Sequence, residues 1–358
     1  MIAEWKKFLE NIGAHIEHDT VRHFGKPDAE LRAAAGATIM ADLSHLGLIR
    51  VSGPDAQSFL HNQFTNDVRQ VSTQRSQLNA YCSPKGRVLA LFRLFQRGAD
   101  YYLCLPQELV AATMQRLRMF VLRARVTLDD ACSRLIHIGL SGPAARTALI
   151  DALGAAPHAM DECLQVEYGG GNVTVMRIPN APQDGGATAY EIAAERGALE
   201  TLWQALAAHA QPVGAPAWAL LNIRSGLPTI YSATKDAFVP QMLNLDVIGA
   251  VSFTKGCYPG QEIVARMRYL GTLKRRMVHA RVDTHEPPYP GDALYVADNE
   301  QSIGQVVDAQ SSPLGGFELL AVIQIAHAHS DQVRWRDRQG PVLQFMELPY
   351  SLETEQSN

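Results

Sequence analysis

The most informative stretch of this sequence is Lys255-Gly256-Cys257-Tyr258-Pro259-Gly260-Gln261-Glu262. It places one thiol in a turn rich in glycine and proline, and the segment from Gln261 to Arg268 that follows is predicted to be helical. A cysteine just before a helix N-terminus lies in the positive field of the helix dipole, and a nearby ammonium adds to that field. We therefore expect Cys257 to be a working thiol, with Lys255 stabilising its charged form. The alternative is a tight turn that holds a small, inert cysteine.

Other motifs extend this pattern over residues 38–345. They are Asp42-Leu43-Ser44-His45-Leu46-Gly47, Val51-Ser52-Gly53-Pro54-Asp55-Ala56, Thr65-Asn66-Asp67-Val68, Tyr190-Glu191-Ile192 and Arg224-Ser225-Gly226-Leu227-Pro228. Together with the octapeptide, they resemble the signature of the YgfZ family of folate-binding proteins. That family is related to the glycine-cleavage T-protein, an aminomethyltransferase. The resemblance implies a tetrahydrofolate-binding factor that supports iron–sulfur cluster assembly or repair and, through it, tRNA modification.

The same resemblance implies roles for individual residues. Glu191 matches the family's pterin-anchoring acid, and Arg224 matches an arginine that contacts folate. Tyr190, Gln261 and Glu262 are further candidate cofactor-binding residues, and Gln261 or Glu262 would hold groups beside the thiol. The cofactor would be tetrahydrofolate or a one-carbon derivative. Iron–sulfur proteins or assembly factors would be the partners. The alternatives are an exposed strand acid at Glu191 and an ordinary helix-end salt bridge at Arg224.

One departure from the T-protein pattern bears on whether the chain is an enzyme. Where the T-protein carries two acids, one of them catalytic, this chain has Ala90 and Leu91. Neither side chain can transfer a proton, so aminomethyl transfer by that route is not expected. A folate-dependent one-carbon transferase of another kind and a non-catalytic folate-sensing protein stay open as alternative functions.

Composition excludes several classes of protein. The formal net charge is −4, so the chain has no overall basic surface, and direct binding of nucleic acid is not expected. No apolar run reaches the length of a membrane span. The five cysteines are scattered without a C-x-x-C pair, which argues for reduced thiols and against a structural zinc site. We therefore predict a cytoplasmic protein with no metal site and no membrane partner.

Two parts of the chain repeat at an offset of 89 residues. Ile49 to Leu60 matches Ile138 to Leu149, and the same offset takes Tyr101 to Tyr190 and Val110 to Leu199. A shared offset over separated stretches predicts duplicated α+β halves. From Met277 onward, short predicted strands separated by turn residues, including one from Leu319 to His327, indicate a small β-barrel.

The predicted fold class is therefore α+β, with two duplicated halves that resemble the T-protein fold and a small C-terminal β-barrel. The predicted domains are an N-terminal helical extension (1–37), a first half (38–132), a second half with the signature loop (133–270), the barrel (271–350) and a tail (351–358).

Overall fold

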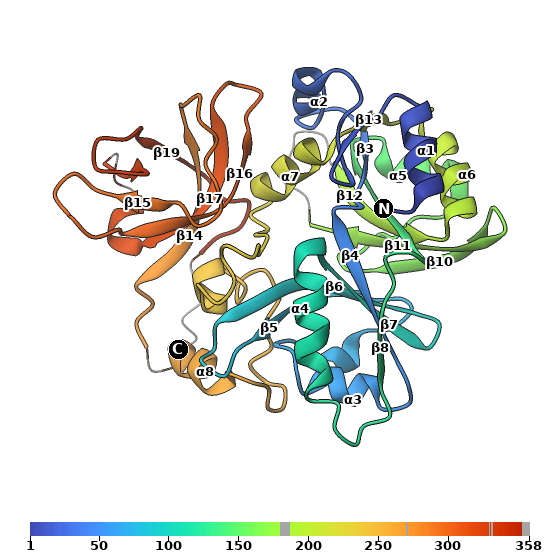
Figure 1. The fold of residues 1–358 in the computed structure, drawn as a ribbon, viewed down its shortest axis with the longest axis horizontal. Coiled ribbons are helices and arrows are strands. Elements are labelled where there is room, and N and C mark those ends of the chain that lie inside the picture. Colours follow the sequence, from blue (N-terminus) through green and yellow to red (C-terminus); the bar gives the residue numbers. More distant parts are fainter. Residues whose placement is uncertain (180–186, 270, 329, 331, 353–358) are drawn as a thin grey trace. The chain divides into compact units, whose positions relative to one another are not determined.

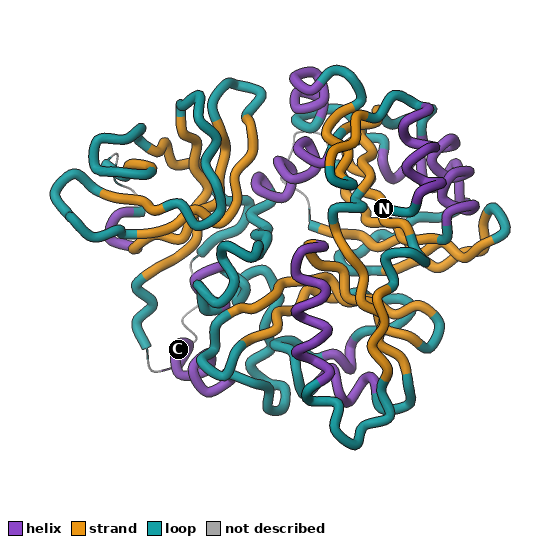
Figure 2. Tube along the Cα trace, in the orientation of Figure 1, coloured by secondary structure: helices purple, strands orange, loops and turns teal. Residues whose placement is uncertain are grey.

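The computed structural model describes residues 1–179, 187–269, 271–328, 330 and 332–352 (Figures 1 and 2). Its chain divides into two compact units. The first unit contains Met1–Phe59, Val68–Gln77 and Phe92–Leu221, and the second contains Leu60–Asp67, Leu78–Leu91 and Asn222–Asn358. The predicted domain boundaries stay a prediction, and most of the predicted tail, residues 353–358, lies outside the described residues.

The elements up to residue 213 follow one another as short strands and helices. In chain order they are α1 (Ala3–Asn11), β1 (His15–Glu17), β2 (Thr20–His23), α2 (Pro27–Ala33), β3 (Ile39–Asp42), β4 (Leu46–Ser52), α3 (Ala56–His61), the 3-10 helix η1 (Val68–Gln70), β5 (Gln77–Cys82), β6 (Val88–Arg97), β7 (Asp100–Pro106), α4 (Gln107–Arg118), β8 (Thr127–Asp130), β9 (Ile136–Gly142), α5 (Ala145–Leu153), β10 (Cys163–Tyr168), β11 (Gly171–Ile178), β12 (Thr188–Ala194), α6 (Arg196–Leu206) and β13 (Gln211–Val213).

The remaining elements follow from residue 215. They are α7 (Ala215–Arg224), the 3-10 helix η2 (Pro240–Leu243), α8 (Gln261–Tyr269), β14 (Arg275–Val282), β15 (Ala293–Tyr295), β16 (Gly304–Ser311), β17 (Phe317–Gln324), the 3-10 helix η3 (Ile325–His327), β18 (Arg334–Trp335) and β19 (Leu343–Met346). None of the helices within the described ranges has both the length and the apolar character that crossing a bilayer requires.

A six-stranded sheet in the first unit has the order β10-β11-β12-β9-β3-β13, and α1, α5 and α6 lie together beside it in Figure 1. Their apolar faces form one core with the sheet, in which the rings of Trp5 and Trp203 meet edge to face at 5.7 Å. Trp5 also donates a hydrogen bond of 2.7 Å to Asp42, so the N-terminal helix is joined to β3 by a buried polar contact. Such a contact satisfies an indole that packing alone would leave unpaired.

A five-stranded sheet has the order β5-β6-β7-β4-β8. Its elements run strand, helix, three strands and helix along the chain, and the same series recurs from β9 to α6. The mixed α and β architecture that the sequence predicts is therefore present.

The six-stranded sheet of the second unit has the order β18-β15-β16-β17-β14-β19 and curls into a half-barrel (Figure 1). Alternate residues of β14 and β17, among them Ala280, Val282 and Ala321, are buried in its core. The predicted strand from Leu319 to His327 is too long, because β17 ends at Gln324 and the next three residues form η3.

Candidate functional site

The signature turn in the second unit is anchored by Lys255. This side chain is only 6% exposed. Its ammonium donates hydrogen bonds to the carbonyl oxygens of His61 and, at 2.6 Å, Phe64. It also lies 5.1 Å from the centre of the Tyr258 ring. A buried ammonium needs such acceptors, so these contacts hold the turn against the end of α3. The predicted action of Lys255 on the Cys257 thiol stays a prediction.

Two glycines bring the signature turn against the β5–β6 hairpin turn. Gly260 has φ +83°, and a Cβ there would lie 2.4 Å from the Ser83 carbonyl oxygen and 2.7 Å from the Gly86 Cα. Gly86 has φ +69° and faces Ile263 in the same way, at 2.9 Å. Only glycine combines this backbone conformation with so close an approach. The octapeptide therefore forms a turn fixed on both sides.

Replacing Gly260 by alanine is expected to lower the free energy of unfolding by about 3 kcal/mol, because the left-handed conformation costs about 1–2 kcal/mol and the overlap with backbone atoms adds a similar amount. Gly249→Ala is the matched control, since Gly249 has φ +74° with nothing within 4 Å. The free energy of unfolding of Gly249→Ala should fall only by the cost of the left-handed conformation, about 1–2 kcal/mol. Urea unfolding measures both variants, and equal losses would show that the contact with the hairpin turn contributes nothing.

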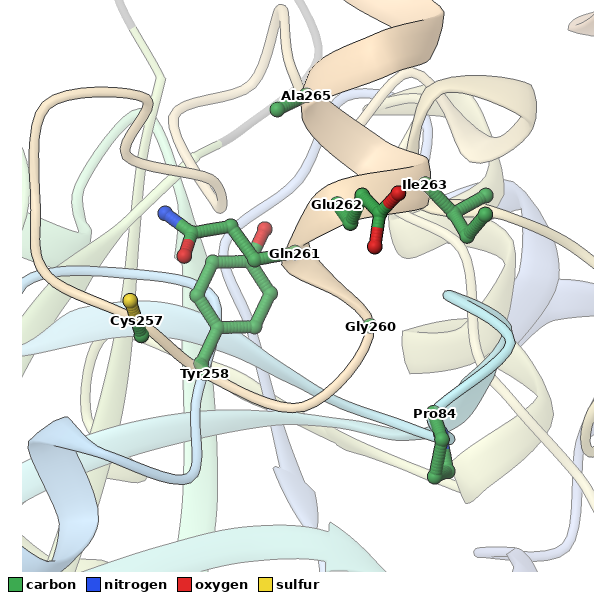
Figure 3. Close-up of a pocket in the computed structure, with 8 residues that line it drawn as sticks. All are labelled: Pro84, Cys257, Tyr258, Gly260, Gln261, Glu262, Ile263 and Ala265. Carbon is green, nitrogen blue, oxygen red and sulfur yellow. The ribbon is translucent and has the colours of Figure 1, made fainter.

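Cys257 is the exposed cysteine of the five; the other four are buried or partly buried. It lines a hollow of about 520 Å³ together with Tyr258, Gln261, Glu262 and Pro84. In Figure 3 the Cys257 thiol and the Gln261 amide lie on one side of the Tyr258 ring, and Glu262 and Ile263 lie on the other. The helix α8 begins at Gln261, as predicted, so its first backbone N–H groups begin four residues after the thiol. An exposed thiol at a hollow can react with a ligand, whereas the buried thiols cannot.

The predicted site residues fall into two groups. Those of the second unit are Lys255, Cys257, Gln261, Glu262 and Arg224, and those of the first unit are Tyr190 and Glu191. On β12 the two neighbours face opposite sides of the sheet. Tyr190 is part of the first unit's core and donates a hydrogen bond of 3.2 Å to the Pro157 carbonyl.

Glu191 is buried, which differs from the exposed acid considered as the alternative. It is 8% exposed, and its Oε2 atom lies 3.8 Å from Arg93 Nε and 3.5 Å from His137 Nε2. Among the described residues, none donates a hydrogen bond to this oxygen. Buried acceptors are normally paired, so this carboxylate keeps capacity for a donor.

The face of the sheet beside Glu191 is covered by an indole ring. Gly139 of β9 is the direct cross-strand partner of Glu191, and a Cβ on Gly139 would lie 2.4 Å from the Trp218 ring. Glycine at this position therefore allows Trp218 of α7 to lie against the strand. Sequence reasoning missed Gly139, Trp218, Arg93 and His137, because strand pairing alone brings them to Glu191.

Arg224, at the end of α7, forms an ion pair with a buried acid. Its guanidinium donates two hydrogen bonds to Glu318, at 2.8 and 2.6 Å. Ser312 donates a third, at 2.8 Å, and His279 Nε2 lies 3.5 Å from the same carboxylate. This bidentate geometry is that of a strong structural ion pair, as in the salt-bridge alternative. A contact between Arg224 and folate stays a prediction.

The chain is similar to known proteins over most of its length. A model of the GCVT N-terminal domain family matches residues 13–255. The tRNA-modifying protein YgfZ of Colwellia psychrerythraea is 29% identical over 325 residues, which cover 89% of this chain and 95% of that protein. The protein of the same name from Edwardsiella ictaluri is 30% identical over 312 residues, covering 86% and 91%.

The fold also has a solved counterpart. The glycine cleavage system aminomethyltransferase T from Bartonella henselae superposes with a TM-score of 0.72 at 18% identity and covers 98% of this chain and 97% of its own. At that identity the likeness shows the fold alone. The sequence relatives and the domain match show more than the fold: the chain is a member of the YgfZ family and carries its GCVT N-terminal domain.

Proposed function

We propose that this protein binds tetrahydrofolate, or a one-carbon derivative of it, and supports the assembly or repair of iron–sulfur clusters. Through the enzymes that contain such clusters it would support tRNA modification, and Cys257 would be its working thiol. The relatives named as tRNA-modifying proteins and the aminomethyltransferase fold support this proposal.

The observation that carries the folate part is the buried Glu191 carboxylate, whose Oε2 has no hydrogen-bond donor among the described residues. The amino-pyrimidine edge of a pterin offers parallel N–H donors, and a carboxylate is the side chain that accepts two of them. Glu191 would bind this edge, while Tyr190 keeps β12 in the core. Bound folate would supply a carrier for a one-carbon unit.

The proposed role of Cys257 as the working thiol rests on the exposure of its side chain. We propose that Cys257 ligates iron transiently, holds sulfur or attacks a folate-linked one-carbon unit, and that Gln261 and Glu262 hold groups beside it in the hollow. Clusters generally use four protein ligands, so one thiol would share a cluster with a partner protein. Ala90 and Leu91 are both buried on β6 and carry no acid, which supports a binding factor over an aminomethyltransferase.

Glu191→Gln tests the folate site. The amide keeps the size of the side chain but loses one acceptor and the charge, so tetrahydrofolate should bind about 10- to 100-fold more weakly. Isothermal titration calorimetry under anaerobic conditions measures the Kd. Glu195→Gln is the matched control, because Glu195 follows the same strand and its side chain is 51% exposed. Equal affinity of wild type and Glu191→Gln would contradict the proposal.

We also propose that the five-stranded sheet and the six-stranded sheet of the first unit, with their helices, arose by duplication. The common series of elements and the common strand order, β5-β6-β7-β4 and β10-β11-β12-β9, support this. The offset of 89 places Tyr102 of β7 where β12 has Glu191. Under this proposal, only the second half kept the acid that binds the pterin.

A further inference from the structure

Three buried side chains from three strands form a line inside the first unit. Cys104 of β7 has its Sγ 3.0 Å from His137 Nδ1, and the other ring nitrogen of His137, on β9, lies 3.5 Å from Glu191 Oε2 on β12. Their exposed fractions are 5%, 2% and 8%. A histidine in contact on both sides can transmit the state of one neighbour to the other.

Burial determines the protonation states of the Cys104 thiol and the His137 ring. It raises the pKa of Cys104 well above its ordinary value, and it lowers the pKa of His137 although Glu191 acts in the opposite direction. At neutral pH both groups are therefore uncharged. The Cys104 S–H can then donate to Nδ1, which leaves the proton of the neutral ring on Nε2, the nitrogen that faces Glu191.

The groups around the line agree with a neutral imidazole. Arg93 Nε also lies 3.8 Å from Glu191 Oε2, and the Arg93 guanidinium donates hydrogen bonds to Asp161 at 2.7 Å and to Ser76 at 3.1 Å. His45 is a further, half-buried imidazole, whose pKa is lowered to about 4 by desolvation and by the nearby His137. No positive charge is needed on His137, because the guanidinium already faces the carboxylate.

A shared metal ion explains the geometry less well. Cys104, His137 and Glu191 are the group of three potential ligands found among the described residues, with their ligand atoms within 4.8 Å of one another. However, Cys104 and Glu191 contact different nitrogens of the same ring. One ion can take only one of these nitrogens, and it would lie close to the Arg93 guanidinium. The thiol at Nδ1 and the carboxylate facing Nε2 account for both ring nitrogens without an ion.

We propose that Cys104 and His137 are positioning residues: the thiol fixes the Nε2–H tautomer of His137, and that N–H orients the Glu191 carboxylate toward the donor edge of a pterin. This inference rests on the proposed folate site and deepens it. The 3.5 Å separation of Nε2 and Oε2 is at the outer limit of a hydrogen bond. Contacts of this kind shorten when a ligand binds. The hydrogen bond from His137 Nε2 to Glu191 Oε2 is therefore expected to form when the pterin is bound.

The first test is the tautomer of His137 in the intact protein, read from its ring ¹⁵N shifts by NMR. Wild type should show the Nε2–H form at pH 7. Cys104→Ala should lose this preference, whereas Cys104→Ser, whose hydroxyl donates as the thiol does, should keep it. An imidazolium or an Nδ1–H form in wild type would overturn the proposal, and so would stoichiometric metal in the purified protein.

The second test is tetrahydrofolate affinity. His137→Leu should weaken binding by about tenfold or more, because the carboxylate loses its orienting donor. His137→Gln, which can place an amide N–H near the position of Nε2, should recover most of that loss. If Glu191→Gln weakens binding and His137→Leu does not, the positioning role of Cys104 and His137 is wrong and the folate site stands. If Glu191→Gln binds as wild type does, the folate site itself is wrong, and so is the role given to His137.

Discussion

In cells that lack this protein, a Cys257→Ser variant is expected to restore almost none of the activity of a [4Fe–4S] enzyme under oxidative stress, whereas wild type restores it. The substitution keeps the size of the side chain and the turn, but a hydroxyl is neither a good iron ligand nor a good nucleophile at neutral pH. Sulfur-containing nucleosides in tRNA, measured by mass spectrometry, should fall in parallel.

Cys132→Ser is the matched control for this experiment. It makes the same change at a partly buried thiol, which accepts the Leu48 N–H at 3.2 Å and contacts Gln107, contacts that a hydroxyl can also make. Both variants should keep the wild-type Tm. Full activity with Cys257→Ser would mean that the signature octapeptide has a structural role, and attention would move to Glu191.

Local patterns in the sequence predicted the elements of the fold well. The helix after the signature begins at Gln261, where it was predicted, since a turn rich in glycine and proline is a local signal. The resemblance to the YgfZ family is confirmed by the sequence relatives. The C-terminal sheet is a half-barrel where a barrel was predicted, because strand lengths and turns do not determine how far a sheet closes.

The surroundings of the site residues could not be predicted in this way. The action of Lys255 on the neighbouring thiol stays a prediction, and local sequence gave no sign that its ammonium contacts carbonyls that precede it by more than 190 residues. The line from Cys104 through His137 to Glu191 likewise depends on the order of strands in two sheets. Nothing in the local sequence around Cys104 indicates an imidazole beside it.

The largest stability effect in the second unit is expected at Glu318. This acid is 1% exposed and is held by Arg224 and Ser312. Glu318→Gln removes the buried charge and leaves the half-buried Arg224 guanidinium beside an amide. Breaking one partner of a buried pair typically costs about 3–5 kcal/mol, so the free energy of unfolding at pH 7 should fall by that amount. Glu300→Gln is the control, since its exposed pair with Arg338 should contribute about 0–1 kcal/mol.

The pH dependence separates this ion pair from a simple packing defect. Burial alone would raise the pKa of Glu318, but the hydrogen bonds from Arg224 and Ser312, the Arg224 charge and the nearby His279 ring outweigh it and hold the pKa far below its ordinary value of 4.5. Because the folded pKa is lowered, the pair stabilises the protein fully above about pH 4.5 and progressively less as the pH falls below it. Urea unfolding from pH 7 to pH 3 should therefore show the gap between wild type and Glu318→Gln narrowing at the acid end. A gap that stays constant would mean that shape at this position, and not its charge, stabilises the half-barrel.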